Sequence, residues 1–242
     1  MILPLQLLER HAMLSSASVF MLNPQFIKAP HSLPMPSSGE VHIWVFAQTA
    51  SGYLSASEQA RADRFINQVA REAFLKGRSG LREACSRYLG TAPGDVEIGI
   101  SDEGKPHLGN ADSLHFNLSH CGSQVVAAFA SEEIGIDLES PARCEDFHGI
   151  AKRFFCPSES LQIEESGARG RDVFFRMWTA KEAMLKLCGA GIAGGLEAAV
   201  TNGPQGARLD GRPVCVEHFG LDERVGAIAS FLPFEVNVWL DL

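Results

Sequence analysis

A regular pattern of hydrophobic and polar positions begins near residue 41 and continues to the end of the chain. Some segments repeat apolar residues at helical spacing, and others are short runs rich in β-forming residues. The predicted helices lie at 54–65, 69–89, 150–155 and 172–188. The predicted strands lie at 41–47, 96–100, 115–118, 124–130 and 134–138, and alternation within 214–242 predicts closing strands. The pattern therefore predicts an α/β (α+β) fold.

Three sites along the chain carry signals for helix ends. Ser55 stands at an N-cap position with Glu58 three residues later, which is the pattern of a capping box. A second capping-type start is predicted at Ser158 with Glu159. Gly90 follows the long predicted helix and is expected to end it, because glycine adopts the left-handed conformation of a helix C-terminus.

The order of elements in the second part of the chain repeats that of the first. In each part a strand leads to a capped helix and then to a longer helix. We interpret the chain as duplicated α/β halves, at 40–130 and 131–242, and on this hypothesis a ligand site is expected in the cleft between them. Residues 1–39 end in a Pro- and Ser-rich stretch and are predicted to be a loosely attached N-terminal extension, in which Met13 is an alternative start.

The charge balance and the cysteines restrict the partners and the location. The 29 acidic and 21 basic residues give a net charge of −8, which argues against nucleic acid as a partner. No apolar run is long enough to span a bilayer, and the six cysteines form no disulfide or zinc pattern. We therefore predict a cytoplasmic protein that binds neither nucleic acid nor membrane.

The basic residues are not spread evenly along the chain. Between Arg61 and Arg87 lie seven basic residues and three acidic ones. This local positive surplus within an acidic chain indicates a surface for an anionic ligand or partner.

The sequence G-I-D-L-E at 135–139 is the first candidate for chemistry. On a strand, Asp137 and Glu139 project to one face while Ile136 and Leu138 point to the other, into a core. Two carboxylates on one face can share a hard divalent cation such as Mg²⁺. The alternative is a strand with one solvated polar face.

The segment W-T-A-K-E-A-M-L-K at 178–186 is the second candidate. Trp178, Glu182 and Lys186 follow at intervals of four residues and share one stripe of a helix. If this stripe faces the carboxylates of Asp137 and Glu139, Glu182 would complete a metal site and Lys186 would neutralise a phosphoryl group. The alternative is an exposed ion pair between Glu182 and Lys186.

The third candidate comprises Ser119 and His120, at a predicted strand-to-turn junction, and Lys105 in the turn G-K-P at 104–106. Ser119 and His120 can present a hydroxyl and an imidazole to an anion, or they can satisfy backbone groups of the turn. A Ser-His nucleophilic pair is disfavoured, because the chain has no nucleophile-elbow motif. A Walker A loop is absent too, which disfavours the P-loop nucleotide-binding fold.

Together these motifs resemble those of the 4′-phosphopantetheinyl transferases of the Sfp-like type. The resemblance covers residues 41–242, and Cys121 departs from it, since a serine is usual there. The motifs that carry it are L-S-x-x-E-x-x-R-x-x-R-F at 54–65, G-K-P at 104–106, F-N-L-S-H at 116–120, G-I-D-L-E at 135–139, A-K-R-F-F at 151–155 and W-T-A-K-E-A-x-x-K at 178–186.

The resemblance implies roles for individual residues. Asp137, Glu139 and Glu182 would bind Mg²⁺ on the diphosphate of coenzyme A, and Lys186 would contact the phosphate that is attacked. The catalytic base would be Glu182 or Glu159. The residues implied to bind coenzyme A are Lys105, Ser119, His120 and Lys186, with Arg61, Arg64, Arg78 and Arg82 as further candidates.

The implied reaction is attack by a serine of an apo acyl or peptidyl carrier protein on the β-phosphorus of coenzyme A, with release of adenosine 3′,5′-bisphosphate. The resemblance also implies a pseudo-two-fold pair of α/β halves with the active site in the cleft between them, and a monomer. One alternative is a non-catalytic binding module for coenzyme A or a carrier protein with the same fold. Another is a Mg²⁺-dependent hydrolase of coenzyme A.

Overall fold

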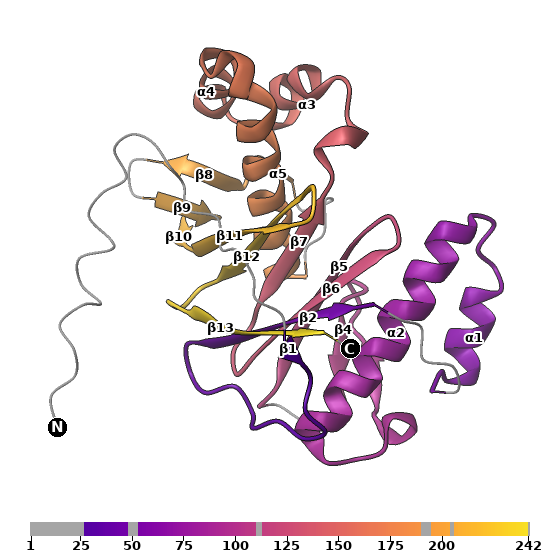
Figure 1. Ribbon diagram of the computed structural model, residues 1–242. Coiled ribbons are helices and arrows are strands. Elements are labelled where there is room, and N and C mark those ends of the chain that lie inside the picture. Colours follow the sequence, from indigo (N-terminus) through magenta and orange to yellow (C-terminus); the bar gives the residue numbers. More distant parts are fainter. Residues whose placement is uncertain (1–26, 48–52, 110–112, 190–194, 204–205, 242) are drawn as a thin grey trace, which may run out of the picture.

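The computed structural model describes residues 27–47, 53–109, 113–189, 195–203 and 206–241 (Figure 1). The helices are α1 (Ala56–Ala62), α2 (Gln68–Leu89), α3 (Phe147–Phe154), α4 (Pro157–Glu165) and α5 (Gly170–Leu187), with short 3₁₀ turns at Pro93–Asp95, Pro141–Arg143 and Gly167–Arg169. The strands are β1 (Ile27–Lys28), β2 (Glu40–Phe46), β3 (Ile98–Ile100), β4 (Pro106–Leu108), β5 (His115–Cys121), β6 (Gln124–Ala130), β7 (Gly135–Glu139), β8 (Ala199–Gly203), β9 (Gly206–Leu209), β10 (Arg212–Pro213), β11 (Cys215–Leu221), β12 (Arg224–Ser230) and β13 (Glu235–Asp241). Among the helices in these ranges, none has the length and hydropathy needed to cross a membrane.

The first half is a five-stranded sheet covered on one face by α2, with strand order β1-β13-β2-β6-β5 (Figure 1). Strand β2 is buried on both faces because it has a core on each side. Trp44 and Phe46 pack in the α2 core, while Ile43 packs in a second core on the other face. This alternation follows from the two-residue period of a strand.

The ends of α1 and α2 form as the sequence predicts. The Ser55 hydroxyl accepts a hydrogen bond from the Glu58 amide, and the Glu58 carboxylate accepts one from the Ser55 amide, so the capping box is confirmed. Gly90 ends α2 with a φ of 68°, in the left-handed region. These signals are local, so they can be read without tertiary information.

The second half contains the sheet β11-β12-β7, with α5 packed against β12 and β7. The helices α3 and α4 lie at the far end of α5, at the top of Figure 1. A short sheet of order β10-β9-β8 completes this half. The rings of Phe155, Phe174 and Trp178 stack where the three helices meet.

The second core joins the two halves. Ile136 and Leu138 of β7 are fully buried in it together with Ile43 of β2 and Val126 of β6. The prediction that Ile136 and Leu138 face a core is therefore confirmed. Because these side chains point into the core, strand alternation directs Asp137 to the opposite face.

The C-terminal strand β13 lies in the first half, although its sequence position would assign it to the half formed by residues 131–242. β13 pairs in parallel with β2, so it belongs to the sheet of the first half and not to a unit of residues 131–242. The order β13-β2 cannot be read from local patterns, since alternation predicts a strand but not its partner.

Part of the predicted N-terminal extension is attached to the first half. β1 pairs with β13, Ala29 is buried, and Arg87 of α2 donates hydrogen bonds to the carbonyls of Ala29 and Pro30. Residues 27–39 are therefore held by the first half, in contrast to the loose attachment expected from their Pro and Ser content. Residues 1–26, including Met13, lie outside the described residues.

Candidate functional site

The two strongest sequence motifs meet where α5 crosses β7. Gly135 allows the close approach, because a Cβ at this position would lie 2.0 Å from the Ala183 carbonyl oxygen of α5. Asp137 is 3% exposed and Glu182 is 7% exposed. Gly135 therefore lets α5 pack close to β7 at Ala183. This packing brings the side chains of Asp137 and Glu182 together.

Lys186 joins the same cluster from the next turn of α5. Its ammonium nitrogen lies 2.5 Å from Asp137 Oδ1 and 3.0 Å from Ser119 Oγ. The stripe of α5 that carries Glu182 and Lys186 therefore faces β7. The alternative interpretations as a solvated strand face and an exposed ion pair are wrong, because Asp137 is buried and Lys186 pairs with it.

Glu182 lies in a strongly anionic and poorly hydrated position. Burial is the largest cause that raises its pKa, and the charges of Asp137 and Glu139 raise it further, while Lys186 opposes them; the resulting pKa is about 7. A carboxyl group with a pKa near 7 can accept a proton at physiological pH and donate it again.

The carboxylate oxygens of this cluster fit a hard divalent cation. Asp137 Oδ2 and Glu182 Oε1 are buried and have no hydrogen-bond partner among the described residues. Buried carboxylate oxygens need a hydrogen bond or a cation, and Mg²⁺ prefers such oxygens. Within the described ranges, no three Asp, Glu, His or Cys side chains lie close enough together to hold a metal ion on their own. The fit therefore rests on these two oxygens and on nearby Glu139.

Strand β5 contacts β7 through side chains. Asn117 Oδ1 accepts a hydrogen bond from the Ile136 amide at 3.0 Å, and Ser119 Oγ accepts one from the Leu138 amide at 3.2 Å. The Ser119 hydroxyl in turn donates to Asp137 Oδ1 at 2.9 Å. The two strands belong to different sheets, so these side chains make the connection between the halves next to the acidic cluster.

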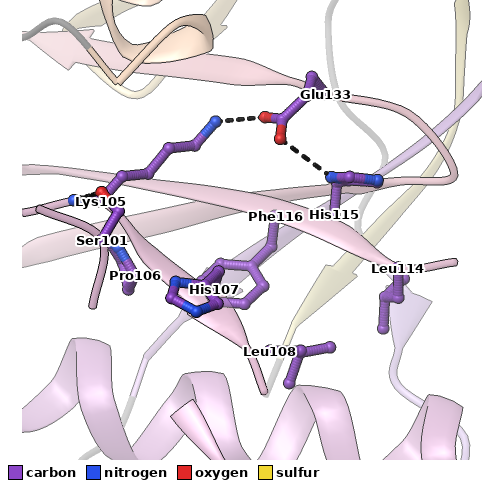
Figure 2. Close-up of a pocket in the computed structure, with 9 residues that line it drawn as sticks. All are labelled: Ser101, Lys105, Pro106, His107, Leu108, Leu114, His115, Phe116 and Glu133. Atoms are coloured by element: carbon purple, nitrogen blue, oxygen red, sulfur yellow. Dashed lines mark hydrogen bonds and ion pairs between the residues drawn. The ribbon is translucent and has the colours of Figure 1, made fainter. Parts of the chain in front are cut away.

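Lys105 links the turn before β4 to the end of α5. Its ammonium group pairs with Glu133 and donates a hydrogen bond to the Leu187 carbonyl at 3.0 Å. Glu133 also lies 3.2 Å from Nδ1 of His115. Figure 2 shows this chain of polar side chains at one side of a pocket of about 290 Å³, whose other walls include Pro106 and Phe116.

A second groove, of about 190 Å³, lies on the other side of Pro106. Its lining includes Phe74, Arg78, Ser119 and His120. Ser119, His120 and Arg78 therefore border the same groove, and their binding of an anion stays a prediction. Lys105 lies one residue before the shared Pro106 and borders the neighbouring pocket.

Two arginines flank the ring of Phe74 at this groove. The guanidinium carbons of Arg61 and Arg78 lie 5.3 and 5.6 Å from its centroid. Nη1 of Arg78 is buried without a hydrogen-bond partner in the described part of the chain. Burial lowers the pKa of Arg78, and the charge of Glu58 partly restores it. Arg78 thus has a donor available for an anion, whereas Arg61 contacts the same Phe74 ring.

Arg64 and Arg82 do not join this cluster. Arg82 is buried and binds Glu58 Oε2 and the Val96 carbonyl, so its donors hold α2 to its neighbours. Arg64 is exposed, and its Nε donates to the Ala60 carbonyl of the preceding helix α1. The helical spacing of basic residues could not separate these arginines from Arg78, because it does not report what lies opposite each side chain.

Glu159 is a buried residue that connects structural elements, and the expectation that it is a second catalytic base lacks support. Its side chain is 0% exposed, pairs with Lys181 at 2.8 Å and accepts two hydrogen bonds from Thr201. Burial alone would raise its pKa, but these hydrogen bonds outweigh it and keep the pKa low. Glu159 also bonds to the Cys156 amide, so α4 begins after Cys156 and not at Ser158.

Comparison with known proteins identifies the family of this fold and site. A model of the 4′-phosphopantetheinyl transferase superfamily matches residues 133–219, and a model described as 4′-phosphopantetheinyl transferase, N-terminal, matches residues 42–133. The chain belongs to the 4′-phosphopantetheinyl transferase family and resembles the Sfp-like type. The two consecutive matches also confirm the predicted fold of two α/β halves.

Individual relatives carry the same family name. The chain is 40% identical over 190 residues to 4′-phosphopantetheinyl transferase HetI of Nostoc sp. strain PCC 7120, covering 72% of this chain and 78% of HetI. It is 31% identical over 144 residues to 4′-phosphopantetheinyl transferase Sfp of Bacillus subtilis strain 168, covering 58% and 62%. A phosphopantetheinyl transferase of Thraustochytrium sp. is 32% identical over 162 residues, covering 60% and 56%. The matched region thus spans less than two thirds of the latter two relatives.

Three residues at the site escaped the sequence interpretation. Asn117 shares a strand face with Ser119, and this i, i+2 spacing is a signal that was available. Phe74 stands one turn of helix before Arg78, so its place beside that arginine follows from helical spacing. Glu133 gives no local signal, because its pairing with Lys105 depends on how two distant segments fold together.

Proposed function

We propose that this protein transfers the 4′-phosphopantetheine group of coenzyme A to a serine of an apo acyl or peptidyl carrier protein. One observation carries the proposal: the buried carboxylates of Asp137 in β7 and Glu182 in α5 form one cluster with the half-buried ammonium group of Lys186. Membership of the transferase family supports the same reaction.

The proposed reaction is a substitution at phosphorus. The serine oxygen of the carrier forms a bond to the β-phosphorus of coenzyme A, and the bond from that phosphorus to the bridging oxygen breaks. Adenosine 3′,5′-bisphosphate leaves with the electron pair, and the serine proton passes to a base. Glu182 is the proposed base, because its buried carboxylate lies in the cluster with Asp137 and Lys186.

Lys186 supplies positive charge where the reaction needs it. Its ammonium group lies in the cluster beside Asp137, and it is proposed to contact the phosphate that is attacked. A fixed cation at that place stabilises the negative charge that grows on the phosphoryl oxygens in the transition state.

We propose Asp137, Glu139 and Glu182 as the residues that hold Mg²⁺. The two buried carboxylate oxygens without partners support this assignment. When bound, Mg²⁺ would neutralise the diphosphate of coenzyme A.

The nucleotide part of coenzyme A is proposed to lie along the groove beside Pro106. Arg78 and His120 border this groove, and Lys105 borders the neighbouring pocket, so basic side chains are available for the 3′-phosphate. Arg61, which flanks Phe74, would add positive charge nearby. A monomeric state and a cytoplasmic location stay predictions.

The proposal is tested by incubating the protein with coenzyme A, Mg²⁺ and a purified apo-carrier protein, and by measuring the mass of the intact carrier. A gain of one phosphopantetheine group is the expected result. Release of adenosine 3′,5′-bisphosphate at the same rate without carrier would instead identify a hydrolase of coenzyme A. Binding of coenzyme A with neither product would identify a binding module.

A further inference from the structure

The hydroxyl of Ser119 already makes every hydrogen bond that its oxygen can make. A serine hydroxyl has one hydrogen to donate and two lone pairs to accept with. Ser119 Oγ donates to Asp137 Oδ1, and it accepts from the Leu138 amide and from the Lys186 ammonium group. A contact of this hydroxyl with a phosphate would have to break one of these three bonds.

Asn117 lies two residues earlier on the same face of β5 and completes the connection. Its side-chain oxygen accepts from the Ile136 amide, just as the Ser119 oxygen accepts from the Leu138 amide. These two amides flank Asp137 on β7, while the other edge of β7 pairs with β12. The backbone on both sides of Asp137 is therefore fixed by two side chains of the opposite half of the molecule.

We infer that Asn117 and Ser119 are positioning residues that fix Asp137, and that the Ser119 hydroxyl does not bind the 3′-phosphate of coenzyme A. This inference rests on the proposed function, because Asp137 is a carboxylate proposed to hold Mg²⁺. It differs from the role that the family resemblance implies for Ser119. Partners that orient a metal ligand typically change metal affinity or activity by about 10-fold to 100-fold when they are removed.

The test uses the full chain with the substitutions Ser119→Ala and Asn117→Ala. Transfer is measured with coenzyme A and with dephospho-coenzyme A, which lacks the 3′-phosphate, over a range of Mg²⁺ concentrations. Calorimetry measures the affinity for adenosine 3′,5′-bisphosphate without metal, so one readout does not depend on activity. Ser86→Ala, which removes a half-buried hydroxyl bonded within α2, is the matched control.

Both variants are expected to lose transfer by roughly the 10-fold to 100-fold typical of residues that orient a metal ligand. The loss should be the same with both coenzymes, and the Mg²⁺ concentration for half-maximal rate should rise. The affinity for adenosine 3′,5′-bisphosphate should equal that of the wild type. Ser119→Thr, which keeps the hydroxyl, should recover most of the transfer that Ser119→Ala loses.

Two results would overturn the inference. A loss in Ser119→Ala that disappears with dephospho-coenzyme A, together with weaker bisphosphate binding, would make the hydroxyl a phosphate contact. A transfer rate of Asn117→Ala equal to that of the wild type would contradict the positioning role of Asn117. If Ser119→Ala fails to fold, Ser119→Cys preserves the size of the side chain and replaces the hydroxyl by a weak donor. A wild-type protein that transfers nothing to the carrier would instead contradict the proposed function itself.

Discussion

The ammonium group of Lys186 lies 2.5 Å from the carboxylate of Asp137, although 49 positions separate the two residues in the sequence. This contact joins the end of α5 to β7 at the place where β5 of the other half also reaches the same carboxylate. Three elements thus meet at one acidic side chain. The reactive cluster depends on the packing of the halves and on no single motif.

Replacing Lys186 by Ala removes the cation that is proposed to contact the attacked phosphate. Loss of one preorganised group that stabilises developing charge costs about 100-fold to 1,000-fold in rate. The rate of carrier modification at saturating coenzyme A should fall by this order. Lys28→Ala, which removes an exposed lysine of β1, should leave the rate unchanged. An unaltered rate in Lys186→Ala would show that the contact with Asp137 has no role in transfer.

Replacing Glu182 by Gln should stabilise the metal-free protein at high pH. The pKa of Glu182 rises from an ordinary value of 4.5 to about 7 on folding, so the folded state binds its proton more tightly than the unfolded chain. This contribution is fully present below pH 4.5 and is lost as the pH rises through 7.

At about pH 8 the variant should exceed the wild type by on the order of 2 kcal/mol in the free energy of unfolding, and at about pH 4 by much less. Urea denaturation in the presence of a chelator measures both values. The same variant should lose transfer. Equal stability of the two proteins at the higher pH would contradict the anionic, desolvated setting of Glu182.

Arg78 and Arg82 should respond differently to substitution by Ala. Arg78 has a buried donor without a partner at the groove, so Arg78→Ala should raise the KM for coenzyme A, and the effect should shrink with dephospho-coenzyme A. Arg82 is buried and pairs with the half-buried Glu58, so breaking this pair should cost less than the roughly 3–5 kcal/mol of stability typical of a fully buried pair. Arg82→Ala should therefore lower Tm, which thermal denaturation measures. A KM effect of Arg78→Ala that is identical with both coenzymes would contradict its assignment to the phosphate.

Glu159→Gln tests the structural setting of Glu159. The amide keeps an acceptor for Thr201 but removes the charge that pairs with Lys181. Leaving the ammonium group of Lys181 buried without a counter-charge should cost about 3–5 kcal/mol of stability. At a temperature where the variant stays folded, the pH profile of transfer should match that of the wild type. If the variant instead lost the rise of the transfer rate with pH that the wild type shows, Glu159 would be the catalytic base.

The local features of this fold could be predicted from sequence, but long-range pairing could not. Ser55 and Gly90 set helix ends through contacts within a few residues, and both predictions are confirmed. The pairing of β13 with β2 depends on which strand edge remains open after the rest of the chain folds. That information is not present in the alternation of the C-terminal segment.

The same division applies to the site. The motifs containing Asp137, Glu182 and Lys186 indicate the chemistry, because the residue types and their spacing are specific. The setting of Glu159 could not be predicted, since a glutamate at the third position of a helix is expected at the surface and here lies against Lys181 in the interior. Burial of a charged residue becomes visible only when its partner is placed beside it.

The central claim is that the cluster of Asp137, Glu182 and Lys186 transfers phosphopantetheine to a carrier protein. The most direct measurement is the intact mass of an apo-carrier after incubation with coenzyme A and Mg²⁺, for the wild type and for Asp137→Ala. The account predicts a gain of one phosphopantetheine group with the wild type, none after addition of a chelator, and none with a folded Asp137→Ala variant. An unmodified carrier with the wild type, or an equal Mg²⁺-dependent gain with the variant, would contradict it.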